Sequence, residues 1–198
     1  MIERLNQETA PYHTDSDADL DPLFRPDTSA GTYMLYLMRV YGFEAPLESS
    51  LSMTPGLELL IDVRARARSG AIAKDLLHLG LRPNLLAELP LCLTVPQFRG
   101  AAEALGWMFV VERACLPHSV IKNHLATRIP AEIDKASEYL SSYAGVVGTR
   151  WRELGQTLDR VAHHPAIADR IVHAAGDAFR CQRRWIQQDH RGAARLVG

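Results

Sequence analysis

The sequence lacks an excess of either charge, and it has no apolar run long enough to cross a bilayer. Its 198 residues include 22 basic and 23 acidic side chains, which give a formal net charge of −1. Nucleic acids and anionic membranes attract proteins through clustered basic side chains, so we expect neither as a partner. A membrane-spanning helix needs about 20 predominantly apolar residues, and no segment approaches that length. The first 20 residues carry acids and a proline where a signal peptide has its apolar core, which predicts a cytoplasmic protein.

Cysteine is scarce, and the motifs of several common catalytic sites are missing. Cys92, Cys115 and Cys181 are odd in number and form no C-x-x-C pair, so we expect reduced, buried or half-buried thiols. The sequence contains no P-loop, no dinucleotide-binding glycine pattern and no G-x-S-x-G elbow. A di-iron helical bundle needs Glu-x-x-His pairs, for which Asp75 with His78 is only a weak substitute. These absences exclude many familiar enzyme classes.

Alternating apolar and polar residues, the pattern of a half-buried strand, are also missing, and no internal repeat occurs. Apolar residues recur at helical spacing instead, and 47% of the residues are hydrophobic. We therefore predict an all-α fold in which residues 1–198 form a single domain. Gly42 and Pro46 are expected to interrupt or bend the second helix. Helices are predicted over residues 2–18, 32–40, 57–68, 71–79, 105–125, 131–161 and onward from 166, with connectors at 21–31 and 83–96.

The segment 105–125 is the one around which the rest of the chain is expected to pack. Its first half is apolar on every side, which is typical of a buried helix, and the helix formers of residues 101–104 precede it. Pro117 has no amide hydrogen for the carbonyl of Arg113, and its ring clashes there. The helix must therefore bend or stop within that turn.

Near the amino terminus, Leu5, Thr9 and His13 follow one another at four-residue steps, and Asp17 lies one turn further. Residues at this spacing share a helix face, so His13 and Asp17 are able to touch. Pro11 predicts that the first helix is kinked or begins near residue 10. On spacing alone, a surface or capped histidine is the simpler interpretation of His13, because a lone histidine is seldom a ligand.

Arginines alternate at Arg64, Arg66 and Arg68, within the helix predicted over residues 57–68. Alternating positions on a helix point in different directions. We therefore expect a solvated helix face here and not a binding patch.

Several short motifs spread over most of the chain resemble one known family. They are the Leu5, Thr9, His13 series, YGFEAPLE at 41–48, LPLC at 89–92, ALG at 104–106, and Tyr143, Gly148 and Trp151. Together they resemble the bacterial haem oxygenases associated with phytochromes. The resemblance implies a haem-oxygenase-like fold with a cleft between the first helix and the bent central helix.

The resemblance also implies a function for His13 and Asp17. In that family the histidine of the first helix is the proximal iron ligand, which corresponds to His13. Asp17 would accept the proton of the other ring nitrogen and make the imidazole a stronger donor. Haem would be both substrate and cofactor, opened to biliverdin, iron and carbon monoxide with O2 and an external electron donor. The partners implied are a reductase or a bacteriophytochrome.

The second half of the central helix departs from the family pattern. Relatives carry a motif of the type EGxxLGG, where this chain has Arg113, Pro117 and His118 at the three glycine positions. Phe109 stands where many relatives have tyrosine, and Asn6 where they usually carry a basic residue. Because Arg113 and Pro117 share a face, the implied haem pocket receives a guanidinium stem and a pyrrolidine ring. A buried arginine needs a carboxylate, so we expect Arg113 to reach one or to turn to the surface.

The resemblance, together with these departures from the family pattern, implies two alternative functions. In the first, the protein is a haem oxygenase in which His13 binds the iron while Phe109, Arg113, Pro117 and His118 line the haem. In the second, the fold persists but the pocket is refilled, which leaves a catalytically silent protein that binds haem, a bilin or a protein partner. His118 is placed where it could turn inward and take the sixth iron position.

Overall fold

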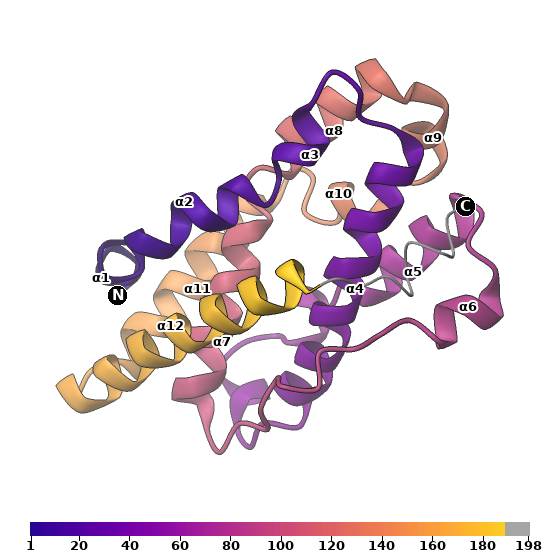
Figure 1. The fold of residues 1–198 in the computed structure, drawn as a ribbon. Coiled ribbons are helices and arrows are strands. Elements are labelled where there is room, and N and C mark those ends of the chain that lie inside the picture. Colours follow the sequence, from indigo (N-terminus) through magenta and orange to yellow (C-terminus); the bar gives the residue numbers. More distant parts are fainter. Residues whose placement is uncertain (189–198) are drawn as a thin grey trace.

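The computed structural model describes residues 1–188, and this part of the chain contains helices and turns but no strand (Figure 1). The predicted all-α fold is therefore confirmed. Two 3-10 helices, η1 (Leu57–Leu59) and η2 (Arg64–Arg66), lie between α4 and α5. The α-helices are α1 (Ile2–Glu8), α2 (Ala10–Ala18), α3 (Asp21–Phe24), α4 (Ala30–Ser52), α5 (Ser69–His78), α6 (Pro83–Ala87), α7 (Ala101–Ala114), α8 (His118–Arg128), α9 (Pro130–Lys135), α10 (Glu138–Ser141), α11 (Val147–Val161) and α12 (Pro165–Gln187).

Helices α7 and α12 lie side by side and pack against each other (Figure 1). Gly106 permits this close approach, because a Cβ atom there would lie 2.4 Å from the carbonyl oxygen of Ile171. Leu105 and Phe109 of α7 are fully buried beside it, as is Ala175 of α12. The apolar first half of the predicted central helix therefore forms the principal core.

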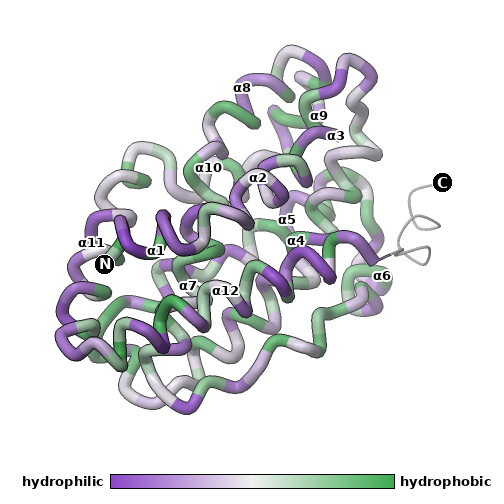
Figure 2. Tube along the Cα trace, turned by 60° about the vertical axis from the view of Figure 1, so that its left-hand side comes forward, coloured by the Kyte–Doolittle hydropathy of each residue, from purple (hydrophilic) through white to green (hydrophobic). Residues whose placement is uncertain are grey.

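A second apolar cluster joins α4, α5, α8, α9 and α10. Its fully buried members include Leu37 of α4, Leu76 of α5 and Leu125 of α8. Figure 2 shows hydrophobic and hydrophilic positions intermixed along most helices, which is the pattern of amphipathic helices around a shared core. No helix among residues 1–188 is both long enough and apolar enough to cross a membrane.

Both proline-dependent breaks occur where the sequence predicts them. Thr9 separates α1 from α2, and Pro11 occupies the first turn of α2, where its missing amide hydrogen is tolerated. The central segment stops at Ala114 and resumes at His118, with Pro117 as the residue before the new helix. These breaks place α2 and the α7–α8 junction as opposite walls of one cleft.

Of the interruption or bend predicted at Gly42 and Pro46, the interruption is wrong, because α4 runs unbroken from Ala30 to Ser52. Pro46 leaves the carbonyl of Gly42 without its helical donor. The amide of Cys92, from the loop after α6, donates to this carbonyl at 2.8 Å. A contact from a distant segment therefore satisfies the group that the proline leaves free.

Two other predicted helices are also wrong in extent. Residues 57–68 form short 3-10 turns and extended backbone, preceded by Gly56 at a φ of 74°. Residues 131–161 divide into α9, α10 and α11, with Gly145 at a φ of 75° in the last break. Left-handed backbone ends a helix and favours glycine, so Gly145 acts as a stop that the apolar spacing does not reveal. Short helices also occur in the predicted connectors, namely α3 within 21–31 and α6 within 83–96.

Candidate functional site

A cavity of about 180 Å³ lies between α2, α4, the α7–α8 junction and α12. It corresponds to the cleft predicted between the first helix and the central helix. Its walls are largely apolar but include several ionisable side chains. The lining residues are Ser16, Asp17, Asp19, Leu20, Pro22, Leu23, Thr32, Leu35, Tyr36, Arg39, Val40, Glu44, Arg113, Ala114, Pro117, Tyr139, Gln182 and Ile186.

An ion pair between Arg113 and Asp17 joins the two walls of this cavity. Both guanidinium Nη atoms lie 3.3 Å from Asp17 Oδ1, and Nη2 also lies 3.4 Å from Oδ2. Arg113 thus reaches a carboxylate, as its expected burial requires. The Arg113 side chain is 19% exposed and that of Asp17 is 62% exposed, so the pair sits at the mouth of the cleft. Pro117 lines the cavity together with Arg113.

His13 does not line the cavity. Its Nε2 lies 3.0 Å from Thr9 Oγ1, and the Thr9 hydroxyl donates its own hydrogen to the Leu5 carbonyl at 2.7 Å. Nε2 must therefore carry the proton and donate to Thr9. The ring also packs on Phe179 of α12, with centroids 5.5 Å apart. Burial and the charge of Arg113 lower the pKa of His13 against the opposing effect of Asp17, which keeps the imidazole neutral at pH 7.

Phe109 and His118, the other two residues predicted to line haem, are buried elsewhere. Phe109 is fully buried between Trp151 and Phe179, with ring centroids at 5.6 and 6.5 Å. His118 is 4% exposed and packs on the ring of Tyr139 at 4.6 Å. Neither His118 nitrogen has a hydrogen-bond partner among the described residues. Burial, assisted by the charge of Arg68, lowers the pKa of His118 to about 3.

The cleft therefore brings together Asp17, Arg113 and Pro117. His13 lies outside the cavity, where its ring is hydrogen-bonded to Thr9 and packs on Phe179. His118 lies against Tyr139, which is itself a wall of the cavity.

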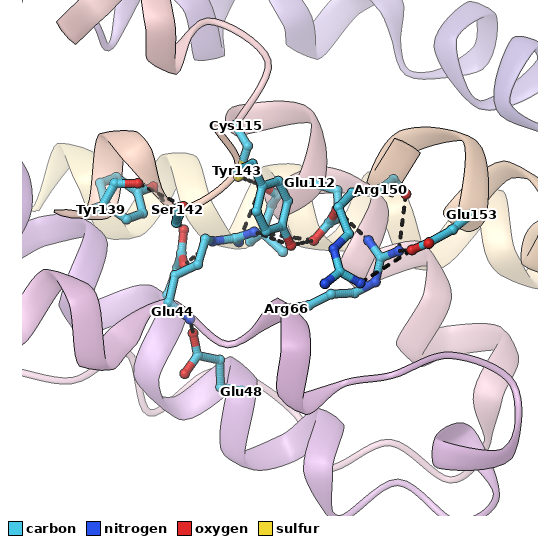
Figure 3. Close-up of polar contacts among 12 residues, drawn as sticks. Glu44, Glu48, Arg66, Glu112, Cys115, Tyr139, Ser142, Tyr143, Arg150 and Glu153 are labelled. Atoms are coloured by element: carbon cyan, nitrogen blue, oxygen red, sulfur yellow. Dashed lines mark hydrogen bonds and ion pairs between the residues drawn. The ribbon is translucent and has the colours of Figure 1, made fainter. Parts of the chain in front are cut away.

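A buried network of ion pairs, which the sequence analysis did not predict, borders the cavity through Glu44 and Tyr139 (Figure 3). Arg66 Nη1 donates to Glu112 at 2.6 Å, and Arg68 Nη1 donates to the same carboxylate at 3.2 Å. Arg68 Nε also donates to Glu44 at 3.0 Å. The expected solvated arginine face is therefore wrong for Arg66 and Arg68, although Arg64 is exposed. Ala67 is extended, and residues two apart on extended backbone point the same way.

Two tyrosines complete the network. Tyr139 donates to Glu44 at 3.0 Å, and Tyr143 donates to Glu112 at 2.6 Å. Burial raises the pKa of Glu44, whereas Arg68 opposes that rise. Each carboxylate accepts several hydrogen bonds, which offsets the desolvation of a buried charge. A signal was available in the sequence, because Glu44 and Glu112 each lie in a largely apolar stretch of a predicted helix, and a buried carboxylate needs a cationic or hydrogen-bonding partner.

Glu48, next to the network on α4, holds the backbone of the segment that carries the arginines. Glu48 accepts hydrogen bonds from the amides of Arg68 and Ser69, and from the Ser69 hydroxyl. Because Glu44 and Glu48 are one turn apart on α4, this helix holds both the arginine side chain and its backbone. The network thereby connects α4, α7 and the segment before α5.

Comparison with known proteins agrees with the resemblance in the sequence motifs. The family model described as "Heme oxygenase" matches residues 1–188. The heme oxygenase from Neisseria meningitidis, whose NO- and CO-bound crystal structures are known, has a similar fold with a TM-score of 0.73. The two chains are 20% identical, and the match covers 98% of this chain and 91% of that one. None of the curated proteins matches this chain.

Proposed function

Because the chain belongs to the haem oxygenase family, we propose that it is a catalytically silent member whose haem cleft has been refilled by its own side chains. The observation that carries this proposal is the Arg113–Asp17 ion pair across the cleft, with His13 held outside the cavity. The family implies haem binding, and this chain retains the fold with Arg113 and Pro117 among the residues that line its cleft.

The residues present do not fit haem in this arrangement. A cavity of about 180 Å³ is close to the engineered cavity of about 150 Å³ that binds benzene. Ligand pockets typically measure about 300–1,000 Å³, and a porphyrin has several times the atoms of benzene. His13 would also have to turn toward the cleft, because its Nε2 faces Thr9 and its ring is not among the cavity-lining residues.

The free energies of the contacts that haem would have to break show which obstacle to haem binding is the largest. Breaking a neutral hydrogen bond such as His13–Thr9 costs about 0.5–1.5 kcal/mol, and an exposed ion pair contributes about 0–1 kcal/mol. Both are small beside the affinity of a tightly bound ligand of nanomolar Kd, about 12 kcal/mol. The volume taken by Pro117 is therefore the larger barrier, because its ring is fixed to the backbone, whereas the Arg113 side chain can turn away once its ion pair breaks.

The second candidate is an active haem oxygenase, and one observation favours it. The imidazole of His13 is neutral at pH 7, which is the form that ligates iron. Bound haem would supply the oxidative chemistry with O2 and an external electron donor, and the products would be biliverdin, iron and carbon monoxide. His13 would hold the iron, and Asp17 would have to leave Arg113 to orient the imidazole. A reductase or a bacteriophytochrome would be the partner in this case.

Haem titration of the purified chain, followed by reductant under air, separates the two candidates. The silent protein shows weak or absent Soret binding and forms no biliverdin. In the variant Arg113→Gly/Pro117→Gly the cleft gains space, so we expect haem affinity to rise at least tenfold. Arg170→Gly is the matched control, because Arg170 is an exposed arginine of α12 paired with Glu103, remote from the cleft.

The active candidate predicts different results in the same experiment. Wild-type protein would convert haem to biliverdin, and the double variant would give no gain. In that case His13→Ala should remove the Soret band while Arg170→Gly leaves it unchanged.

A further inference from the structure

Two of the three cysteines meet in the folded chain although 89 positions separate them. Cys92 belongs to the loop between α6 and α7, and Cys181 to α12. Their sulfur atoms lie 3.8 Å apart. The hydroxyl of Thr94, an exposed residue, lies 3.3 Å from each sulfur, so the three side chains form one small cluster at the edge of the apolar core.

We propose that Cys92 and Cys181 form a reversible disulfide when the protein meets a peroxide. A disulfide has a sulfur–sulfur distance of about 2.05 Å, so the two sulfurs need to approach by roughly 1.8 Å in total. Small changes of the two side-chain torsions supply much of such a movement.

The backbone holds this pair in place before any bond forms. The amide of Cys92 donates to the Gly42 carbonyl, which Pro46 leaves free in α4. On the other side, Trp185, one turn beyond Cys181, donates its indole N–H to the Arg39 carbonyl of α4 at 2.8 Å. Both cysteines are thus fixed relative to the same helix.

The burial of the pair determines which oxidant can reach it. Cys92 is 2% exposed and Cys181 is 4% exposed, so bulky disulfide reagents are excluded and a small uncharged peroxide is favoured. Burial also raises the pKa of the Cys181 thiol, which makes its thiolate scarce and the reaction slow. Cys115 has no thiol neighbour among the described residues, and its Sγ donates to the Val111 carbonyl.

The oxidation balances with peroxide as the only co-reactant. One sulfur attacks a peroxide oxygen, the O–O bond breaks, and a sulfenic acid and one water form. The other sulfur then attacks the sulfenic sulfur, and the S–S bond forms as the S–O bond breaks and a second water leaves. Two thiols lose two electrons and two protons in all, and a dithiol reductant reverses the change.

The bond would fasten the loop to α12 beside Gln182, a residue of the cavity wall. It would close a loop of about 90 residues, which restricts the unfolded chain. We expect the oxidised protein to have a Tm higher than that of the reduced protein by roughly 5–15 °C.

The test is to treat the purified full chain with hydrogen peroxide and to map its peptides without reduction. We expect one intramolecular bond between the peptides of Cys92 and Cys181, a mass loss of two hydrogens, and a fall from three titratable thiols to one under denaturing conditions. Dithiothreitol should restore all three thiols and the lower Tm.

Three variants sharpen this test. Cys115→Ser should form the bond as the wild type does, whereas Cys92→Ser and Cys181→Ser should show neither the mass loss nor the rise in Tm. Three thiols that stay reduced, a bond that includes Cys115, or a bond between two chains would overturn the proposal. Peptide mapping of the wild type decides this even if a serine variant fails to fold.

Discussion

Glu112 and Arg113 are consecutive residues of α7, yet their ion pairs lie in different surroundings. Glu112 points into the buried network, where it meets Arg66 and Arg68 with both sides almost fully buried. Arg113 points to the cleft and pairs with Asp17, which is 62% exposed. Consecutive positions on a helix differ in direction by about 100°. Helix α7 therefore contributes Glu112 to buried ion pairs on one side and Arg113 to an exposed ion pair on the other.

This difference in burial determines how much each ion pair contributes to the free energy of unfolding. A buried charge that loses its partner stays in a poor solvent for ions, whereas an exposed one returns to water. The network around Arg68 should therefore control stability, and the Arg113–Asp17 pair should control access to the cleft. The following experiments test that division, beginning with the largest expected effect.

Replacing Glu112 by glutamine should destabilise the protein by about 3–5 kcal/mol, because Arg66 and Arg68 lose the charge that compensates their burial. This corresponds to a fall in Tm of roughly 10 °C for a domain of this size, measurable by thermal unfolding. Glu58→Gln, at an exposed position, is the matched control and should leave Tm unchanged. Equal Tm values for the two variants would show that the network does not support the fold.

Acidification should destabilise the protein through His118. Its pKa is about 3 in the folded protein and about 6.5 in the unfolded chain, so the unfolded chain binds more protons between these values. The stability that this group contributes is present above pH 6.5 and is lost as the pH falls toward 3. Between pH 7 and pH 4 we expect a loss of about 3 kcal/mol from this group.

The variant His118→Phe isolates this contribution, because phenylalanine keeps the packing on Tyr139 without a titrating ring. Chemical denaturation of both proteins at several pH values should show a shallower acid dependence for His118→Phe. His173→Phe is the control, since that side chain is 78% exposed. Parallel pH profiles for wild type and His118→Phe would contradict the assignment.

Tyr143→Phe should cost about 1–3 kcal/mol of unfolding free energy, because the hydroxyl that bonds to Glu112 and Arg68 is buried. The control Tyr12→Phe removes a hydroxyl that bonds to the exposed Arg180, so it should change stability by less than about 1 kcal/mol. Denaturant midpoints compare the two. A larger loss of unfolding free energy in Tyr12→Phe than in Tyr143→Phe would contradict this prediction.

Asp17→Asn should change the unfolding free energy least, by about 0–1 kcal/mol, because the Arg113 pair lies at the exposed mouth of the cleft. Its effect should appear in binding instead, since Arg113 is then free to swing away from the cavity. Asp169→Asn, which removes a comparable surface pair with Arg4, is the control for both measurements. A marked loss of stability without any change in haem affinity would show that the pair is structural.

Proline and glycine positions predicted the fold best where their effect is local. Pro11 and Pro117 mark real breaks, because the missing amide hydrogen acts within one turn. Pro46 did not break α4, since Cys92 compensates from a distant loop. The helix predicted over 131–161 is wrong in extent because helical spacing does not show where a left-handed glycine, here Gly145, ends a segment. The helix predicted over 57–68 is wrong because the backbone there forms 3-10 turns and an extended residue at Ala67.

The candidate site was predictable only in part. The need of Arg113 for a carboxylate follows from its surroundings, but its partner Asp17 lies 96 positions away and no local pattern selects it. The spacing of His13 and Asp17 allowed a contact between them, and the structure shows Asp17 bonded to Arg113 instead. Whether His13 binds iron remains a prediction for the haem titration.

The sequence by itself determined the helical class, the positions of two breaks and the family, because these depend on local backbone chemistry and on short motifs. Only the tertiary structure decided that Arg66 and Arg68 are buried, that Cys92 meets Cys181, and that the cleft is crossed by an ion pair. Each of these depends on which distant segments pack together, and that choice is made by the burial of apolar surface over the whole chain.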